Sequence, residues 1–180
     1  MTPADFVKTY YPEAYKCYQQ TGLHPLAILA QCALETGWGK YCPGNMMFGI
    51  KDTDGVNGNE QLLETFEFSK RQNETWGGRR IKSVTPTPIN GVMFYKYVIM
   101  DYFRKYDTAA ESFADHVKFF EQNGYYAQAL KLKGDCNAFI DAMAVHYSTS
   151  PGYAATLKEI ARSIQKIAVS LGITPLVPYT

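Results

Sequence analysis

Residues 26–51 read LAILAQCALETGWGKYCPGNMMFGIK, and this stretch decides how the rest of the chain is interpreted. Its first half is typical of a buried helix, because small and apolar side chains surround the few polar ones on every side. The helix is expected to end at Thr36-Gly37-Trp38-Gly39, since glycine commonly follows the last helical turn. Glu35 would then lie where a helix leaves the core, partly desolvated, with its carboxyl pKa raised toward that of a general acid. The alternative is that Glu35 is an ordinary polar residue at a helix end.

The composition of the whole chain is that of one globular domain. It has 180 residues, of which 46% are hydrophobic and 19% charged, enough to bury a substantial core. The formal net charge of +1 gives no strong field toward nucleic acid or an anionic surface, so no nucleic-acid partner is predicted. Neither a signal peptide nor an apolar run of roughly 18 residues is found, so no membrane insertion is expected. The 14 tyrosines suit a sugar-binding cleft, with core packing as the alternative.

The four cysteines and three histidines do not form a recognisable metal site. The cysteines have no CxxC spacing and no histidine pair beside them, so zinc is not predicted. Two of them, Cys17 and Cys32, fall in expected helices and are interpreted as buried apolar residues. Whether Cys42 is paired stays open.

Helices are expected on both sides of a strand-rich segment. Thr2-Pro3 is a typical helix start, and Pro12 is expected to interrupt that first helix. Thr108 and Glu111 form a capping box for a later helix. The last helix is expected to open at Ser150-Pro151, with Ser150 as its cap.

The segment from about 52 to 106 has a different periodicity. Residues 61–68 and 92–105 are rich in aromatic and branched side chains, which favours two antiparallel strands. They flank a polar stretch containing Trp76-Gly77-Gly78 and Pro86-Thr87-Pro88, interpreted as a long, partly ordered insertion. The predicted fold class is therefore α+β, mainly α, as a single domain over 1–180 with a small antiparallel β-hairpin lobe inserted between helices.

Two motifs carry a resemblance to a known family. The run Asn45–Lys51, NMMFGIK, resembles the N-(L/M/W)-F-G-(I/V)-K signature of bacterial cell-wall glucosaminidases, and ALETGWGK precedes it at the expected distance. The run Tyr147–Ala154, YSTSPGYA, is similar to the Y-A-T-D-P-x-Y-A motif of the same group, family 73 of the glycoside hydrolases. Ser148 and Ser150 depart from that pattern, which puts the geometry of this loop in question. The resemblance covers nearly the whole chain and implies a lysozyme-like fold.

The resemblance also implies roles for individual residues. Glu35 would be the general acid, and Thr65-Phe66-Glu67 matches the T-x-E pattern that places a second carboxylate on the hairpin. Glu64 is three positions away and would point to the opposite face of a strand, so only one of the two can serve; both could also be solvated. Tyr147 would act in catalysis or in positioning the substrate. The expected substrate-binding residues are Trp38, Asn45, Phe48, Gly49 and Tyr153.

The function implied is that of an endo-β-N-acetylglucosaminidase. It would cut the GlcNAc-β-1,4-MurNAc bond in the glycan strands of peptidoglycan, acting on the cell wall as a monomer without metal or cofactor. A muramidase or lytic transglycosylase of the same fold is one alternative. A catalytically weak wall-binding module is another. Inverting and substrate-assisted routes both stay open, because the separation of the carboxylates does not follow from sequence.

Overall fold

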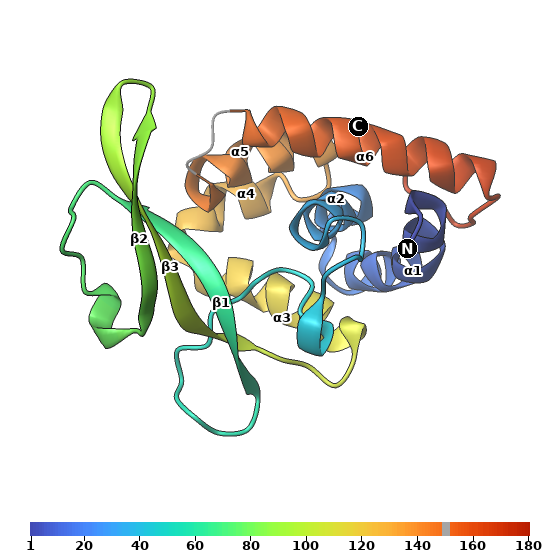
Figure 1. Cartoon of the computed structure of the whole chain (residues 1–180). Helices are drawn as coiled ribbons and strands as arrows, with labels where there is room; N and C mark the ends of the chain where they lie inside the picture. The colour runs from blue at the N-terminus through green and yellow to red at the C-terminus, as the bar shows by residue number, and fades with distance from the viewer. Residues whose placement is uncertain (149–151) are drawn as a thin grey trace. The chain divides into compact units, whose positions relative to one another are not determined.

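The computed structural model describes residues 1–148 and 152–180 and contains helices and one small sheet (Figure 1). The chain forms two compact units, one of residues Met1–Phe48 with Tyr106–Thr180 and one of residues Gly49–Lys105. The first unit holds the α-helices α1 (Pro3–Thr21), α2 (Pro25–Thr36), α3 (Ala109–Gln122), α4 (Ala127–Lys131), α5 (Cys136–Tyr147) and α6 (Tyr153–Ser170). The second holds strands β1 (Glu60–Ser69), β2 (Ile81–Ile89) and β3 (Val92–Arg104). The predicted α+β class with mainly helical content and a small antiparallel sheet is confirmed.

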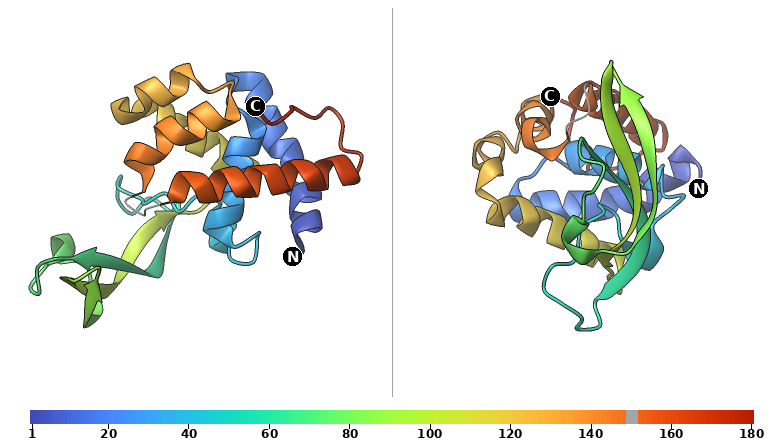
Figure 2. Two further views of the ribbon diagram at one scale, coloured as in Figure 1. Left: turned by 90° about the horizontal axis from the view of Figure 1, so that it is seen from above. Right: turned by 60° about the vertical axis from the view of Figure 1, so that its left-hand side comes forward.

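Helix α2 is the centre of the helical unit. It packs against α1, α5 and α6, and the left view of Figure 2 shows α6 crossing it. Nearly every residue of α2 is buried, as its small apolar sequence predicts. The His24 side chain accepts from the Leu26 N–H at its start, and Gly37, with φ 58°, closes its end in the left-handed conformation that glycine adopts readily. The core therefore fixes α2 along its length and leaves only its C-terminal turn near solvent.

Helix α1 is continuous through Pro12, so the predicted interruption is wrong. A proline inside a helix removes one N–H donor, and the carbonyl that loses its partner is that of residue Lys8. Both Pro12 and Lys8 are exposed, so water can satisfy that carbonyl. At the start of α3, Thr108 accepts from the Glu111 N–H, as the predicted capping box requires. The Glu111 carboxylate accepts from the Asp107 N–H at 3.0 Å, one residue before the position that a capping box uses. The expected cap at Ser150 lies outside the described residues.

The sheet has three strands in the order β1-β3-β2, all antiparallel. Strand β2 occupies part of the segment expected to be a polar insertion, so the two-strand prediction is corrected to three. Its Pro86 and Pro88 are tolerated because β2 is an edge strand, where alternate N–H groups need no partner. Asn90 and Gly91, with φ of 49° and 77°, form the tight turn into β3 that this dipeptide favours.

Candidate active site

Glu35 lies in the last turn of α2, at the end of the buried helix. Its side chain is exposed on one side, while the protein atoms behind it remove part of its hydration. That desolvation raises the pKa of the Glu35 carboxyl, as predicted, and a hydrogen bond from Tyr153 acts in the opposite direction. The Tyr153 hydroxyl donates to Glu35 Oε1 at 3.4 Å. The carboxyl is thus reachable by a ligand and is protonated more readily than a freely solvated glutamate.

Tyr147 and Tyr153 form a stacked pair beside this carboxyl. Tyr147 ends α5 and Tyr153 begins α6, and their ring centroids are 5.8 Å apart at an interplanar angle of 15°. Burial raises the pKa of the Tyr147 hydroxyl well above its usual value, and the negative charge of Glu35 adds to the effect. Burial also raises the pKa of Tyr153. Both hydroxyls therefore stay protonated and can act as hydrogen-bond donors, and the structure brings Glu35, Tyr147 and Tyr153 together.

Trp38 and Asn45 are engaged within the helical unit. The half-buried Trp38 ring packs edge-on against Phe6, with centroids 5.5 Å apart. The Asn45 amide donates to the carbonyl oxygens of Tyr106 and Asp107, each at 3.0 Å. Both residues have positive φ, 62° for Trp38 and 52° for Asn45, a backbone strain that non-glycine residues adopt mainly where surrounding contacts impose it. The contacts of these two side chains thus hold the backbone in place at residues 38 and 45.

Phe48 is a core residue in this structure. Its side chain is buried and its ring stacks on His116, with centroids 3.8 Å apart and the planes within 5° of parallel. Phe113 packs against it edge-on at 5.1 Å. Gly49, by contrast, is exposed and has a φ of 60°, which only glycine adopts without strain. Any influence of Phe48 on a ligand is therefore exerted through the residues that its ring supports.

Gln31 and His116 are two buried polar residues that sequence reasoning missed. His116 Nε2 lies 3.1 Å from Gln31 Oε1, and the Gln31 amide nitrogen lies 3.5 Å from the sulfur of Met143. Burial lowers the pKa of His116 to about 3, so the ring is neutral at physiological pH. The sequence did contain one indication of Gln31: it precedes Glu35 by four residues and so lies on the same face of α2.

In the second unit, Glu67 and Glu64 lie on opposite faces of β1, as strand alternation predicts. Glu64 is exposed and pairs with Lys82. The half-buried Glu67 Oε1 lies 2.6 Å from Lys51 Nζ, and the same ammonium group lies 3.0 Å from the carboxylate of Asp101. Lys51 therefore bridges Glu67 to a buried carboxylate.

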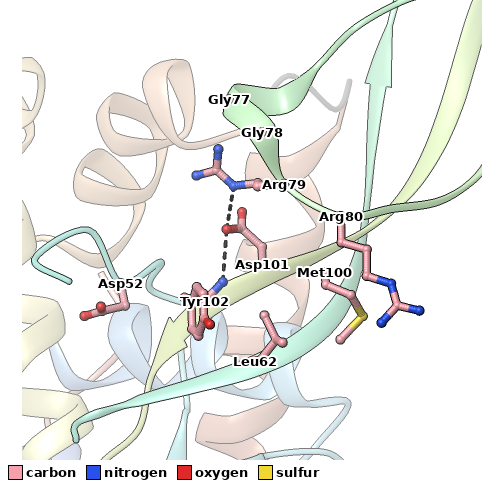
Figure 3. Close-up of a pocket in the computed structure, with 9 residues that line it drawn as sticks. All are labelled: Asp52, Leu62, Gly77, Gly78, Arg79, Arg80, Met100, Asp101 and Tyr102. Atoms are coloured by element: carbon pink, nitrogen blue, oxygen red, sulfur yellow. Dashed lines mark hydrogen bonds and ion pairs between the residues drawn. The ribbon is translucent and has the colours of Figure 1, made fainter. Parts of the chain in front are cut away.

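Asp101 anchors this network from the central strand. Its Oδ1 accepts from Arg79 Nε at 2.6 Å and from the Tyr102 N–H at 3.0 Å (Figure 3). The Arg79 and Lys51 cations hold the pKa of the Asp101 carboxyl below its usual value against the opposing effect of burial. A hollow of about 460 Å³ adjoins it, and Figure 3 shows its lining residues: Asp52, Leu62, Gly77, Gly78, Arg79, Arg80, Met100, Asp101 and Tyr102.

Among residues 1–148 and 152–180, no group of three or more His, Cys, Asp or Glu side chains is arranged to hold a metal ion. The four cysteines are free thiols. In the same part of the chain, no helix combines the length and the apolar character needed to cross a membrane.

A helical unit with an acidic residue at the end of its central helix, together with a small antiparallel sheet, is the set of elements that the resemblance to glycoside hydrolases implies. Residues 11–166 match the model of the glucosaminidase family, described as mannosyl-glycoprotein endo-beta-N-acetylglucosaminidase. The chain belongs to this family, which confirms the resemblance seen in the two motifs.

Relatives and solved structures agree with this placement. The chain is 31% identical over 173 residues to the peptidoglycan hydrolase FlgJ of Pseudomonas aeruginosa, covering 95% of this chain and 39% of that protein. It is 29% identical to FlgJ of Vibrio parahaemolyticus, covering 92% and 49%. The chain therefore spans half or less of the length of these relatives. A peptidoglycan hydrolase mutant from Sphingomonas sp. A1 superposes with a TM-score of 0.65 at 26% identity, covering 93% of this chain and 99% of that one.

Proposed function

We propose that this domain is a peptidoglycan hydrolase, an endo-β-N-acetylglucosaminidase that cuts the GlcNAc-β-1,4-MurNAc bond. The observation that carries the proposal is Glu35: in a chain of the glucosaminidase family, an accessible carboxyl of raised pKa ends the buried helix and contacts a tyrosine. The relatives that carry the name peptidoglycan hydrolase support the choice of substrate. The domain would act on glycan strands of the cell wall as a monomer.

In the proposed mechanism, Glu35 protonates the glycosidic oxygen as the bond to the leaving sugar breaks. A raised pKa increases the fraction of the carboxyl that still holds its proton at a given pH, as a general acid requires. Once the proton has been transferred, the new carboxylate accepts the hydrogen bond from Tyr153. This donor favours the charged state that the acid adopts as the reaction proceeds.

The remaining expected site residues take supporting roles in this proposal. Glu67 would supply the second carboxylate, either to activate water or to stabilise positive charge on the sugar, with Lys51 holding it in place. Tyr147 would orient water or the substrate through its hydroxyl. The ring of Tyr153 would contact the sugar, Gly49 would allow close approach of the backbone, and Trp38, Asn45 and Phe48 would shape the site from within the fold.

Digestion of purified peptidoglycan followed by mass spectrometry tests this function. We expect products that end in a reducing GlcNAc. A reducing MurNAc would instead identify a muramidase, and a 1,6-anhydro product would identify a lytic transglycosylase. Glu35→Gln should keep the circular dichroism spectrum and melting temperature and lose nearly all product. If Glu35→Gln releases fragments at a rate close to that of the parent, Glu35 is not the acid; if the parent itself releases none, the domain only binds the wall.

A further inference from the structure

The two faces of the sheet in the second unit differ in burial. Alternate residues of β3 from Tyr97 to Phe103 are buried, and Glu67 of β1 shares their face because it lies opposite Tyr97 in the register. The other face carries half-buried Val98 and Met100 together with four large apolar side chains that are 40–57% exposed: Leu62, Phe66, Phe68 and Tyr102. We call these six residues the apolar strip. Contiguous apolar area on a protein surface commonly marks a binding site.

The apolar strip is continuous along two neighbouring strands. Leu62 lies opposite Tyr102 and Phe66 lies opposite Val98, and β1 and β3 run side by side over this length (Figure 1). The rings of Phe66 and Phe68 pack edge-on, with centroids 5.9 Å apart at 80°. At a strand rise of about 3.3 Å per residue, the strip is about 20 Å long from residue 62 to residue 68. A row of this shape and length fits a chain molecule better than one small ligand.

Two lysines lie over aromatic rings of the same face. Lys96 Nζ is 4.5 Å from the ring centroid of Phe66, and Lys70 Nζ is 5.7 Å from that of Phe94. Lys96 lies opposite Phe68, and Phe94 precedes it by two residues, so both belong to the face of the strip. In the part of the chain that the structure describes, neither lysine forms an ion pair with a carboxylate. Both cations are therefore available to a ligand.

The acidic residues of this face are already engaged. Glu64 forms an ion pair with Lys82. Glu60 Oε2 accepts from the backbone N–H groups of Asn57 and Gly58, at 3.1 and 2.8 Å. The face thus combines aromatic rings with positive charge that has no internal partner. Its ligand should carry negative charge and flat apolar surfaces.

Peptidoglycan has both properties, because its sugar rings have apolar faces that stack on aromatic side chains and its peptide stems carry free carboxylates that pair with lysine. We propose that the apolar strip, with Lys96 and Lys70, is a second binding surface for a peptidoglycan strand, on the face of β1 opposite Glu67. The identity of the polymer rests on the proposed function. A membrane surface fits less well, since it would desolvate the ion pair of Glu64, which lies between Leu62 and Phe66.

Binding to purified insoluble peptidoglycan, measured by pelleting, tests this proposal. All variants carry Glu35→Gln, so that the polymer is not digested during the measurement. The test variant is Phe66→Thr/Phe68→Thr, which removes two rings and keeps residues that favour strands. The matched control is Val169→Thr, which removes a 62% exposed apolar side chain from α6 in the other unit. Circular dichroism and melting temperatures report whether each variant is folded.

We expect the test variant to raise the Kd at least tenfold, because a strand held at two surfaces dissociates more slowly than a strand held at one. The control should bind like the parent. Lys96→Glu should also raise the Kd, and added NaCl should weaken its binding less than that of the parent, because a pairing with carboxylates has been lost. If the test variant does not fold, Lys96→Glu, which keeps every ring, decides the question.

The proposal is overturned if both variants bind like the parent or if Val169→Thr loses as much affinity as they do. A parent that sediments as a dimer, with a monomeric test variant, would instead make the strip a surface for a second copy of the chain. Binding to phosphatidylglycerol vesicles without binding to peptidoglycan would make it a membrane surface.

Digestion by the active parent separates this inference from the proposed function. If the parent releases fragments ending in a reducing GlcNAc while both strip variants bind normally, only the second binding surface is refuted. If binding depends on the strip but the parent releases no fragments, the strip is confirmed and only the proposed hydrolase activity is refuted.

Discussion

Replacing Tyr153 by phenylalanine isolates the contribution of one hydroxyl to the acid. The ring and its stacking on Tyr147 at 5.8 Å are kept, and only the donor to Glu35 is removed. A well-formed hydrogen bond to a charged group contributes about 1.5–3 kcal/mol. At 3.4 Å this bond is longer than a good O–H···O contact, and Glu35 is exposed, so we take half of the lower figure, about 0.7 kcal/mol. That energy corresponds to about 0.5 pKa unit.

The direction of the change in the Glu35 pKa follows from the protonation state that the hydrogen bond from Tyr153 favours. The donor stabilises the carboxylate and so lowers the pKa of Glu35, and its removal should raise that pKa. Because a general acid works in its protonated form, the alkaline limb of kcat/KM should move to higher pH by about 0.5 unit. The assay is a pH–rate profile on soluble glycan fragments, with Tyr125→Phe, an exposed tyrosine, as the control. A limb that stays in place or moves to lower pH would refute the reasoning.

Three further variants test the other roles. Glu67→Gln should cost more rate than Glu64→Gln in the same assay, because the two side chains lie on opposite faces of β1; equal small losses would shift the second role to bound water or to the acetamido group of the substrate. Tyr147→Phe should lower kcat a hundredfold or more, about 2.7–4 kcal/mol, if its hydroxyl stabilises developing charge, whereas an unchanged kcat together with a raised KM in Tyr147→Ala would leave only a stacking role. Lys51→Met should lower the free energy of unfolding in urea by about 1–3 kcal/mol, because the buried Asp101 loses one of its two cations; no change would mean that Arg79 alone suffices.

Sequence reasoning succeeded where local chemistry decides the structure. Helix α2 could be predicted from its apolar composition and its flanking His24-Pro25 and Gly37, and β1 and β3 from their branched and aromatic residues. It failed at the prolines. Pro12 was expected to interrupt its helix, and the two prolines of β2 were assigned to a partly ordered insertion. A proline lacks one N–H donor, which matters little where water or the free edge of a sheet faces that position. Which prolines are exposed is a tertiary property that the local pattern does not contain.

The polar residues of the helical unit also differ in whether the local sequence predicts them. Glu35 could be found because its unusual position is visible within one helix, and Tyr147 and Tyr153 because they share one motif. The pair of Gln31 and His116 is separated by 85 residues, and no spacing rule connects a glutamine in one helix to a histidine in another. Only the folded structure shows that they meet, and that the His116 ring lies edge-on to the ring of Tyr147.

The structure shows what three side chains of the NMMFGIK run contact. Asn45 holds two backbone carbonyls, Phe48 supports the ring of His116, and Lys51 bridges two carboxylates of the second unit. All three side chains interact with other parts of the protein. We therefore interpret them as residues that hold neighbouring groups in position and not as residues that bind the sugar directly. A substitution at Phe48 would on this view affect Tyr147 through the ring of His116, which contacts both, rather than by removing a contact with substrate.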